Sequence, residues 1–159
     1  MTWLPARAGG ADPFERVFRL RPNLYEAWRE FAEVFYEKQL VDPTLLELAR
    51  LRVAQLHRAA WPLSQRRPEA PLDPQRVAAL ERWWEGDAFD ARERACLRFA
   101  EQFVLDASGI GDADAAAVRM ALGDAGMVAF VEALALFDGF TRFCVILGIA
   151  QDAGPEARA

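Results

Sequence analysis

Residues 42–58 read DPTLLELARLRVAQLHR, and this stretch decides how the chain folds. Its first residue, Asp42, can accept hydrogen bonds from the free backbone N–H groups at the start of a helix. Pro43 follows at the position where a missing N–H group costs least. Most of the remaining residues are Leu, Ala, Arg, Glu and Gln, which are strong helix formers. We therefore expect a helix that begins after Asp42, and we expect Pro62 to end it at about residues 60–61.

Similar start signals recur on both sides of this stretch. Asp90 is followed three residues later by Glu93, a capping-box pattern that predicts a helix from Ala91 to about Leu105. The other expected cap residues are all Asn or Asp: Asn23, Asp73, Asp112 and Asp124. No segment shows the sustained alternation with β-branched residues that is typical of a strand. The sequence therefore predicts an all-α fold.

The last expected helix, from Ala125 to about Gln151, is apolar on nearly all sides. Such a helix is either buried or crosses a membrane. Glu132, Asp138 and Arg142 interrupt it and leave no uncharged run longer than nine residues, whereas a membrane span needs about 20. We therefore expect a core or interface helix and no membrane partner. Asp138 and Arg142 stand four residues apart, which allows them to pair on one face.

The composition of the 159-residue chain limits its partners and its chemistry. It has 24 acidic residues against 19 basic ones, and the resulting net charge of −5 argues against nucleic acid as a partner. One histidine and two separated cysteines are too few for a zinc site of the usual kind, so we expect neither a metal nor a cofactor. Cys96 and Cys144 lie in apolar surroundings without a CxxC spacing, which favours reduced, buried thiols in a cytoplasmic protein.

The length of the chain fits one domain spanning residues 1–159, with a core at about residues 20–151 and loosely ordered ends. Within this domain, residues 48–68 contain five arginines and no acidic residue. These arginines could form an anion-binding patch. The alternative is a solvated face, because 18 of the 19 basic residues of the whole chain are arginine and the local surplus carries little information.

The helix expected after Asn23 carries apolar side chains at the 4, 3, 4 spacing of one buried stripe. Its members are Leu24, Trp28, Phe31 and Phe35. Aromatic residues of this and other segments are numerous enough to line an apolar pocket, although aromatic residues at helical spacing usually belong to the core. The candidates for such a pocket are Trp28, Phe31, Trp61, Trp83, Trp84 and Phe137.

Several ordered blocks of the sequence resemble the alkylhydroperoxidase D-like and carboxymuconolactone decarboxylase-like family. In residues 42–58, a glutamate is followed by an apolar run containing Arg-Val-Ala-Gln, which is similar to the signature helix of the family. Residues 89–95, FDARERA, are similar to the start of a further family helix, and residues 136–148 are similar to its C-terminal helix. The resemblance covers about residues 20–151. It implies a bundle of about six or seven helices that assembles as a homo-oligomer, as a dimer, trimer or hexamer.

The sequence departs from this family at the redox site. In redox-active members a glutamate stands twelve positions before the first cysteine of a CxxC motif, and a histidine stands four positions after the second cysteine. Counted from Glu47, these positions hold Ala59, Pro62 and Arg66. A thiol peroxidase needs a reactive thiolate and a second cysteine that resolves the sulfenic acid. The resemblance therefore implies a member that lacks the CxxC motif, and peroxidase activity is the function that we expect least.

Two residues could still act as an acid or a base. Glu47 is the retained glutamate of the resembling site, and the alternative is that it pairs with Arg50 on a solvated face. His57 is the only histidine, and the alternative is that it caps the end of its helix. The candidates to bind a small anionic or aromatic ligand are Arg58, Trp61 and Trp28. We expect a binding or assembly role without catalysis, and the alternative is acid–base chemistry on a small anion of the lactone type.

Overall fold

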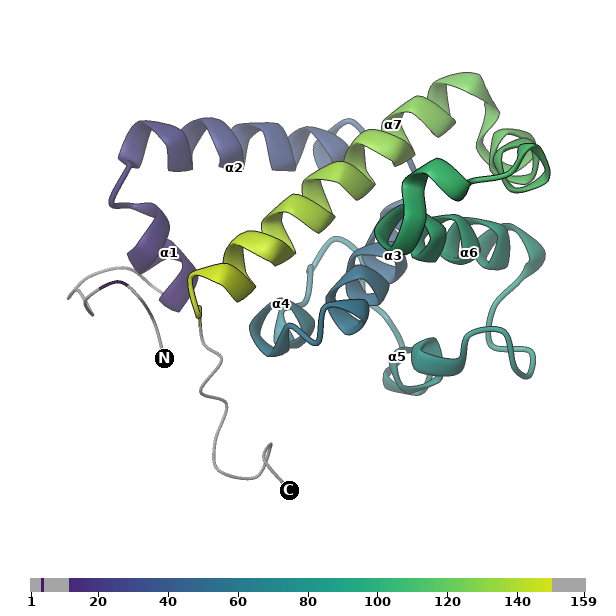
Figure 1. The fold of residues 1–159 in the computed structure, drawn as a ribbon, viewed down its shortest axis with the longest axis horizontal. Coiled ribbons are helices and arrows are strands. Elements are labelled where there is room, and N and C mark those ends of the chain that lie inside the picture. Colours follow the sequence, from purple (N-terminus) through teal and green to yellow (C-terminus); the bar gives the residue numbers. More distant parts are fainter. Residues whose placement is uncertain (1–3, 5–11, 150–159) are drawn as a thin grey trace.

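The computed structural model describes residue 4 and residues 12–149. Seven α-helices lie within these ranges (Figure 1). They are α1 (Pro13–Phe18), α2 (Pro22–Glu37), α3 (Pro43–Leu56), α4 (Ala60–Ser64), α5 (Pro74–Ala79), α6 (Ala91–Asp106) and α7 (Asp112–Ile146). Short 3₁₀ turns follow α5 and α6, at Leu80–Arg82 and Ala107–Gly109. No strand occurs in the described ranges, and the expected all-α fold is confirmed.

Three of the expected helix starts carry the side-chain caps that the sequence predicts. Asp42 accepts hydrogen bonds from the backbone N–H groups two and three residues later, at 2.8 and 3.2 Å. Asp73 accepts one from the N–H group two residues later, at 2.7 Å. The Asp90 side chain accepts a hydrogen bond from the Glu93 N–H group at 2.8 Å, and the Glu93 side chain accepts one from the Asp90 N–H group at 3.0 Å. Together they complete the capping box. Each of these contacts lies within three residues, so the pattern is visible in the sequence.

Three other expected caps are wrong: Asn23, Asp112 and Asp124. α2 begins at Pro22, before Asn23, because a proline has no N–H group to leave unpaired in the first turn. α7 begins at Asp112 itself, with Gly111 in the cap position. Asp124 instead accepts a hydrogen bond from the Arg119 side chain at 2.6 Å. The chain turns inside α7 at Gly123, whose φ of 70° is a conformation that glycine adopts without steric cost.

α3 is the central helix and packs against both α6 and α7 (Figure 1). Ten consecutive residues, 45–54, are buried, so neighbours cover every side of this helix. Leu46 lies in a cluster with Phe130 of α7, whereas Leu51 lies in a second cluster with Leu97 of α6. Burial of the whole helix also places charged side chains inside the protein, where each needs a partner. These side chains are Glu47, Arg50 and Arg52.

α2 lies along one edge of the molecule and contacts α1 and α7 (Figure 1). The stripe expected on this helix is only partly buried. Phe35 is buried and Trp28 is half-buried, but Leu24 and Phe31 are 59% and 42% exposed. The prediction of one buried stripe is therefore wrong for these two residues. A 4, 3, 4 spacing defines a face of a helix, but it does not determine how much of that face a neighbouring element covers.

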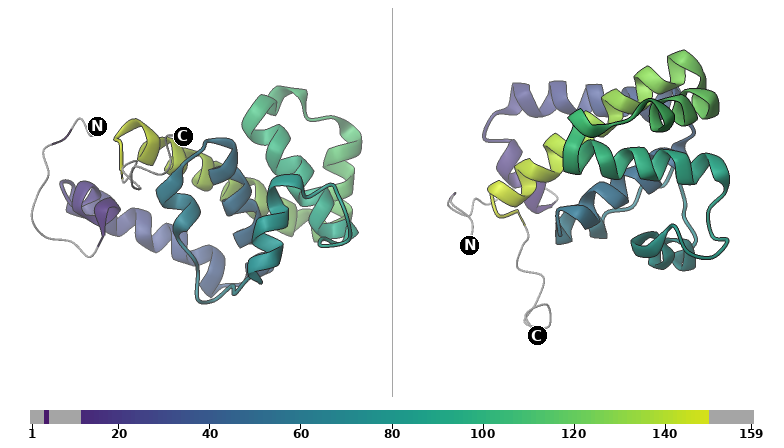
Figure 2. Two further views of the ribbon diagram at one scale, coloured as in Figure 1. Left: turned by 90° about the horizontal axis from the view of Figure 1, so that it is seen from below. Right: turned by 45° about the vertical axis from the view of Figure 1, so that its right-hand side comes forward.

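α7 consists of two helical segments that meet at Gly123; the second ends at Ile146, and its last turns meet α1 (Figure 2). The expected end at about Gln151 is therefore wrong, because the helix ends at Ile146. The chain ends that we expected to be loosely ordered, residues 1–12 and 153–159, lie outside the described residues except for Leu4 and Asp12, and Asp12 caps α1. α7 is long and apolar enough to cross a membrane. Core helices of soluble proteins can meet the same criterion of length and composition. Only 22% of its most apolar stretch is buried, and Met120, Val128 and Ile146 are exposed. The homo-oligomer stays a prediction. The exposed apolar side chains of α7 provide a surface that such an assembly would bury.

Candidate functional site

The chain turns sharply after α3, earlier than the sequence indicates. α3 ends at Leu56, and Arg58 has a φ of 52°, in the left-handed region. The short helix α4 follows and holds Pro62 in its first turn, where the N–H group that proline lacks has no partner in the helix. The expectation that Pro62 itself ends the preceding helix is therefore wrong. Residues 57–66, which we call the α4 strap, run beside α3 and contact it through polar groups.

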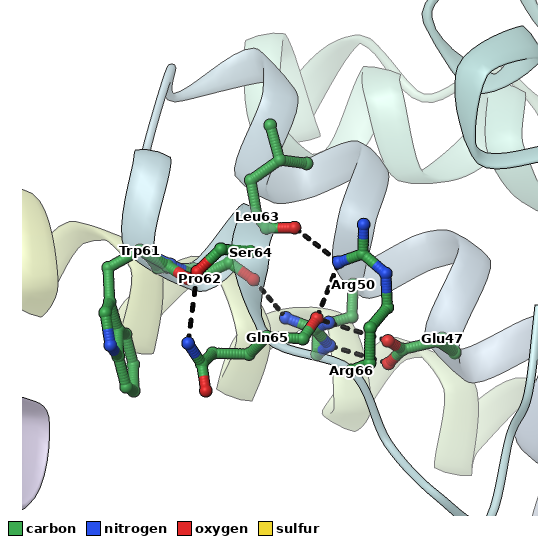
Figure 3. Close-up of polar contacts among 8 residues, drawn as sticks. All are labelled: Glu47, Arg50, Trp61, Pro62, Leu63, Ser64, Gln65 and Arg66. Atoms are coloured by element: carbon green, nitrogen blue, oxygen red, sulfur yellow. Dashed lines mark hydrogen bonds and ion pairs between the residues drawn. The ribbon is translucent and has the colours of Figure 1, made fainter. Parts of the chain in front are cut away.

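Glu47 and Arg50 form a buried ion pair between α3 and the α4 strap (Figure 3). The Nε and Nη2 atoms of Arg50 lie 2.7 Å from the two carboxylate oxygens of Glu47. Glu47 has no exposed surface and Arg50 is 7% exposed. The expected pair is thus present, but the expected solvated face is wrong, because the α4 strap and the core cover it. Both oxygens of the Glu47 carboxylate are already bound by the guanidinium.

The same guanidinium binds the α4 strap. Its Nη1 atom donates to the Pro62 carbonyl at 2.7 Å, and its Nη2 atom donates to the Gln65 carbonyl at 2.8 Å. Figure 3 shows Arg50 between these carbonyls and Glu47. Arg66 donates from Nη1 to the Leu63 and Gln65 carbonyls and is exposed. Arg50 therefore fixes the strap to α3.

His57 reaches across to α7 from the end of α3. Its Nε2 atom lies 2.6 Å from Oδ1 of Asp138, and both side chains are mostly buried. The second Asp138 oxygen accepts a hydrogen bond from Nε of Arg142 at 2.8 Å, so the pair expected between these two residues is present. His57 is also the capping residue of α3. Its ring joins the α4 strap to α7, while Glu47 is held by Arg50, and the two candidate acid–base residues belong to separate clusters.

A cavity of about 310 Å³ lies between α2, the α4 strap and α7. Six aromatic rings form much of its wall, and they belong to Phe14, Trp28, Tyr36, Trp61, Phe137 and Phe140. Trp28 and Phe140 stack at 5.1 Å between ring centroids, and Trp61 stacks on Phe14 at 5.4 Å. Two of the expected ligand-binding residues, Trp28 and Trp61, thus line one cavity. The third, Arg58, is exposed and is not part of its wall.

The remaining aromatic candidates lie away from this cavity, except Phe137. Phe31 is exposed on α2, and Trp84 is 52% exposed. Trp83 is buried and donates a hydrogen bond from its indole nitrogen to Glu101 at 2.7 Å. The same Glu101 oxygen accepts a hydrogen bond from Nε of Arg52 at 2.6 Å. Arg52 of α3 is therefore satisfied by a second polar cluster, on the side of the helix that faces α6.

Tyr36 is a cavity residue that the sequence analysis missed. It follows Phe35 in α2, is 5% exposed and lines the cavity, yet its hydroxyl has no hydrogen-bond partner among the described residues. Burial raises the pKa of this phenol to about 12, although the positive charge of Arg67 acts in the opposite direction. The guanidinium of Arg67 lies 4.4 Å from the centroid of the Tyr36 ring and pairs with Glu33 at 2.9 Å. Helical periodicity marks Tyr36 as near the core, but it does not indicate that this residue borders a cavity or that its hydroxyl is buried without a partner.

The two cysteines are free and buried, as their apolar surroundings predict. Cys96 lies in the cluster around Phe130, whereas Cys144 lies in a separate cluster near the C-terminal end of α7. Burial raises the pKa of each thiol to about 12. A thiol with such a pKa is protonated at neutral pH and is a poor nucleophile. In residue 4 and residues 12–149, no three His, Cys, Asp or Glu side chains gather closely enough to hold a metal ion.

Comparisons with known proteins establish the fold alone. No family model matches the chain, and no curated protein matches it. A crystal structure of a protein of unknown function from Agrobacterium tumefaciens is similar, with a TM-score of 0.74 over 85% of this chain and 93% of that one. That protein is provisionally described as the antioxidant defence protein AhpD, and 19% of the residues are identical. The expected AhpD-like helical fold is thereby confirmed.

Proposed function

We propose that this protein is an AhpD-like protein without thiol peroxidase activity, and that it binds a small organic molecule in the cavity between α2, the α4 strap and α7. The observation that carries the proposal is the cavity itself. Six aromatic rings line it, and its volume of about 310 Å³ lies at the lower end of the range of ligand sites in proteins. An aromatic wall with a few polar groups is the usual composition of such a site.

The arrangement of Glu47 favours binding over acid–base catalysis. A general base must reach the proton that it removes, within about 3.2 Å or through one water. Both oxygens of Glu47 instead accept hydrogen bonds from Arg50, and the side chain has no exposed surface. His57 is held by Asp138 and does not line the cavity. Neither candidate acid–base residue is therefore free to exchange a proton with a molecule in the cavity. The aromatic rings line the cavity and can contact such a molecule.

The first expected result concerns the thiols. With a pKa of about 12, only about one thiol in 10,000 is ionised at pH 8. Native protein should therefore resist labelling by 5,5′-dithiobis(2-nitrobenzoate) at pH 8, and both thiols should react once urea unfolds the chain. The same preparation should consume no organic hydroperoxide with a dithiol as reductant. Turnover that disappears in Cys96→Ser or Cys144→Ser would contradict the proposed loss of peroxidase activity.

The second expected result concerns the cavity. Fluorine NMR should show that 4-fluorobenzoate, 4-fluorotoluene or both bind to the wild-type protein. Ala32 is buried in α2 and lines the cavity, so Ala32→Leu places three more carbon atoms in the binding space. This substitution should weaken binding of the probes by at least about tenfold, because the leucine side chain occupies space that the fluorophenyl ring of the probe needs.

Ala116→Leu provides the matched control, because Ala116 is exposed on α7 and lies outside the cavity wall. It should bind the probes as the wild type does. Ala32→Leu should keep its helical circular dichroism, which shows that the variant is folded. Failure of both probes to bind, or binding that Ala32→Leu leaves unchanged, would argue against a ligand site in this cavity.

A further inference from the structure

We propose that two copies of this chain pack against each other through the second segment of α7, residues 124–146, as an antiparallel pair related by a two-fold axis near residue 137. The proposal goes beyond the ligand site and does not depend on it, because the surface involved contains no residue of the cavity wall. Three observations support it: an exposed face of α7, a charge pattern that is complementary to itself, and small residues at the centre of that face.

One face of the second segment of α7 is exposed along its whole length. Exposed residues recur on it at steps of four and three, which is the spacing of a helix face that packs on another helix. They form a row about 27 Å long, because a helix rises 1.5 Å per residue. Figure 1 shows this segment passing in front of α2. We call the row the α7 stripe, and its members are Val128, Glu132, Ala135, Gly139, Arg142 and Ile146.

The charges of the α7 stripe are complementary to those of an antiparallel copy. In a two-fold interface the same surface supplies both sides, so a residue before the axis faces one that lies equally far after it. Glu132 stands five residues before residue 137, and Arg142 stands five residues after it. Glu132 therefore faces Arg142 of the partner subunit, and the same contact recurs on the other side of the axis. The interface thus contains two pairs of opposite charge.

Both charged side chains are available for these pairs. Glu132 is exposed and has no ion pair with a described residue. The Arg142 side chain is 52% exposed, and its Nε atom donates to Asp138 at 2.8 Å. No described residue accepts a hydrogen bond from its Nη1 and Nη2 atoms, which can therefore donate to the partner subunit. Asp138 also contacts His57, so the contact between subunits would extend a row of charged groups that begins at the end of α3.

The other residues of the α7 stripe fit the same arrangement. Ala135 and Gly139 lie two residues on either side of the axis, and such small residues let two helix backbones approach closely. A Cβ atom at Gly139 would meet no atom within 4 Å, so packing within the chain does not require the glycine. Glycine is less favourable than alanine inside a helix, and the approach of a second helix explains its presence. At the two ends, Val128 faces Ile146 of the partner subunit, and these side chains are 72% and 62% exposed in the single chain.

The charges favour a second copy over a lipid bilayer. α7 is long and apolar enough to cross a membrane, and exposed apolar surfaces occur at protein contacts and membrane contacts alike. Glu132 and Arg142 lie within the stripe, however, and the interior of a bilayer would have to accept both charges without water. A second copy instead supplies an opposite charge to each. An unrelated partner protein would require no symmetry in this surface, whereas a two-fold pair does.

The first test measures the mass of the wild-type protein and of charge variants by light scattering over a dilution series. At about 50 µM the wild type should have twice the chain mass of 17.8 kDa, because association follows mass action. Glu132→Arg places like charges together at both contacts, and it should raise the dissociation constant of the dimer at least about tenfold. Adding Arg142→Glu restores opposite charges, so the double variant should dimerise at least about tenfold more tightly than Glu132→Arg alone.

The second test determines the relative direction of the two helices. Under oxidising conditions, a variant with both Val128→Cys and Ile146→Cys should form covalent dimers, because facing cysteines can form a disulfide when their Cα atoms lie within about 7 Å. Neither single variant should do so, since the two copies of each position lie about 27 Å apart in the antiparallel pair. The two native cysteines are buried and do not compete for this reaction.

Asp87→Arg is the matched control, because it makes the same change of charge at an exposed residue between α5 and α6. It should dimerise as the wild type does, and circular dichroism should show that every variant is folded. Four results would overturn this inference: a wild-type mass of one or three chains, a wild-type monomer that floats with phosphatidylcholine vesicles, a double charge variant as weak as Glu132→Arg, or covalent dimers of either single cysteine variant. The proposed ligand site would stand in each case, because it is tested through other residues.

Discussion

Arg50→Ala should lower the free energy of unfolding by about 3–5 kcal/mol, which is the usual cost of breaking a buried ion pair by removing one partner. The substitution leaves the Glu47 carboxylate without exposed surface and without its two hydrogen bonds from the guanidinium. It also removes the donors that hold the carbonyls of Pro62 and Gln65. Because a domain is stable by only about 5–15 kcal/mol, this is a large share of the total. Urea unfolding followed by circular dichroism measures the difference.

Two further variants separate the charge from the attachment of the α4 strap. Glu47→Leu combined with Arg50→Met removes both charges, and it should be less destabilising than Arg50→Ala because no buried charge is left unpaired. Arg119→Ala is the surface control. Its pair with Asp124 is exposed on both sides, so its loss should cost at most about 1 kcal/mol. If Arg50→Ala were no more destabilising than Arg119→Ala, the buried pair would not stabilise the fold as argued here.

Leu46→Ala and Leu51→Ala should each cost about 2–5 kcal/mol, the usual range for a buried leucine. Neither side chain has any exposed surface, and they face different clusters on opposite sides of α3. The loss has two parts, the apolar surface no longer buried and the cavity left behind. Their sites share no close partner, so the effects of the two substitutions should be nearly additive in the double variant. The same urea titration provides the three values.

Leu105→Ala is the matched control on α6, because the Leu105 side chain is 70% exposed. It should change the free energy of unfolding by no more than about 0.5 kcal/mol. A loss at Leu46 as small as the loss at Leu105 would mean that α7 does not cover that side of α3. The equivalent result at Leu51 would mean that α6 does not cover the other side. Either outcome would contradict the description of α3 as the central helix of the fold.

Much of the fold could be predicted from the sequence because the signals that start a helix are local. Asp42, Asp73 and Asp90 each cap a helix through backbone groups no more than three residues away. Asn23 failed because a proline stood before it and began the helix. Asp112 failed because Gly111, in an ordinary extended conformation, takes the cap position. Asp124 failed because the chain turns at Gly123, whose φ of 70° favours glycine. Prediction of a helix start therefore succeeds where one side chain and its nearest N–H groups decide the outcome.

The candidate site was predictable only in part. Glu47 and Arg50 are three residues apart, so their pairing is a local event, but their burial depends on the α4 strap, whose bonded carbonyls lie 12 and 15 residues after Arg50. His57 and Asp138 stand 81 residues apart, and nothing in the sequence joins them. Trp28 and Trp61 are visible as aromatic residues, yet only packing brings them to one cavity. Arg58 is the opposite example: its place in the sequence is close to that of Trp61, but it is exposed and is not part of the cavity wall.

The sequence by itself thus determined an all-helical chain, three of its helix caps, two cysteines in apolar surroundings and a Glu47–Arg50 pair. These features depend on composition and on contacts within one helical turn. The tertiary structure alone decided that Glu47 is buried, that α3 ends at Leu56, and that Tyr36 lines a cavity while its buried hydroxyl has no partner among the described residues. The physical reason is that burial and cavities arise where distant segments meet, and no spacing within one helix records how closely another helix approaches.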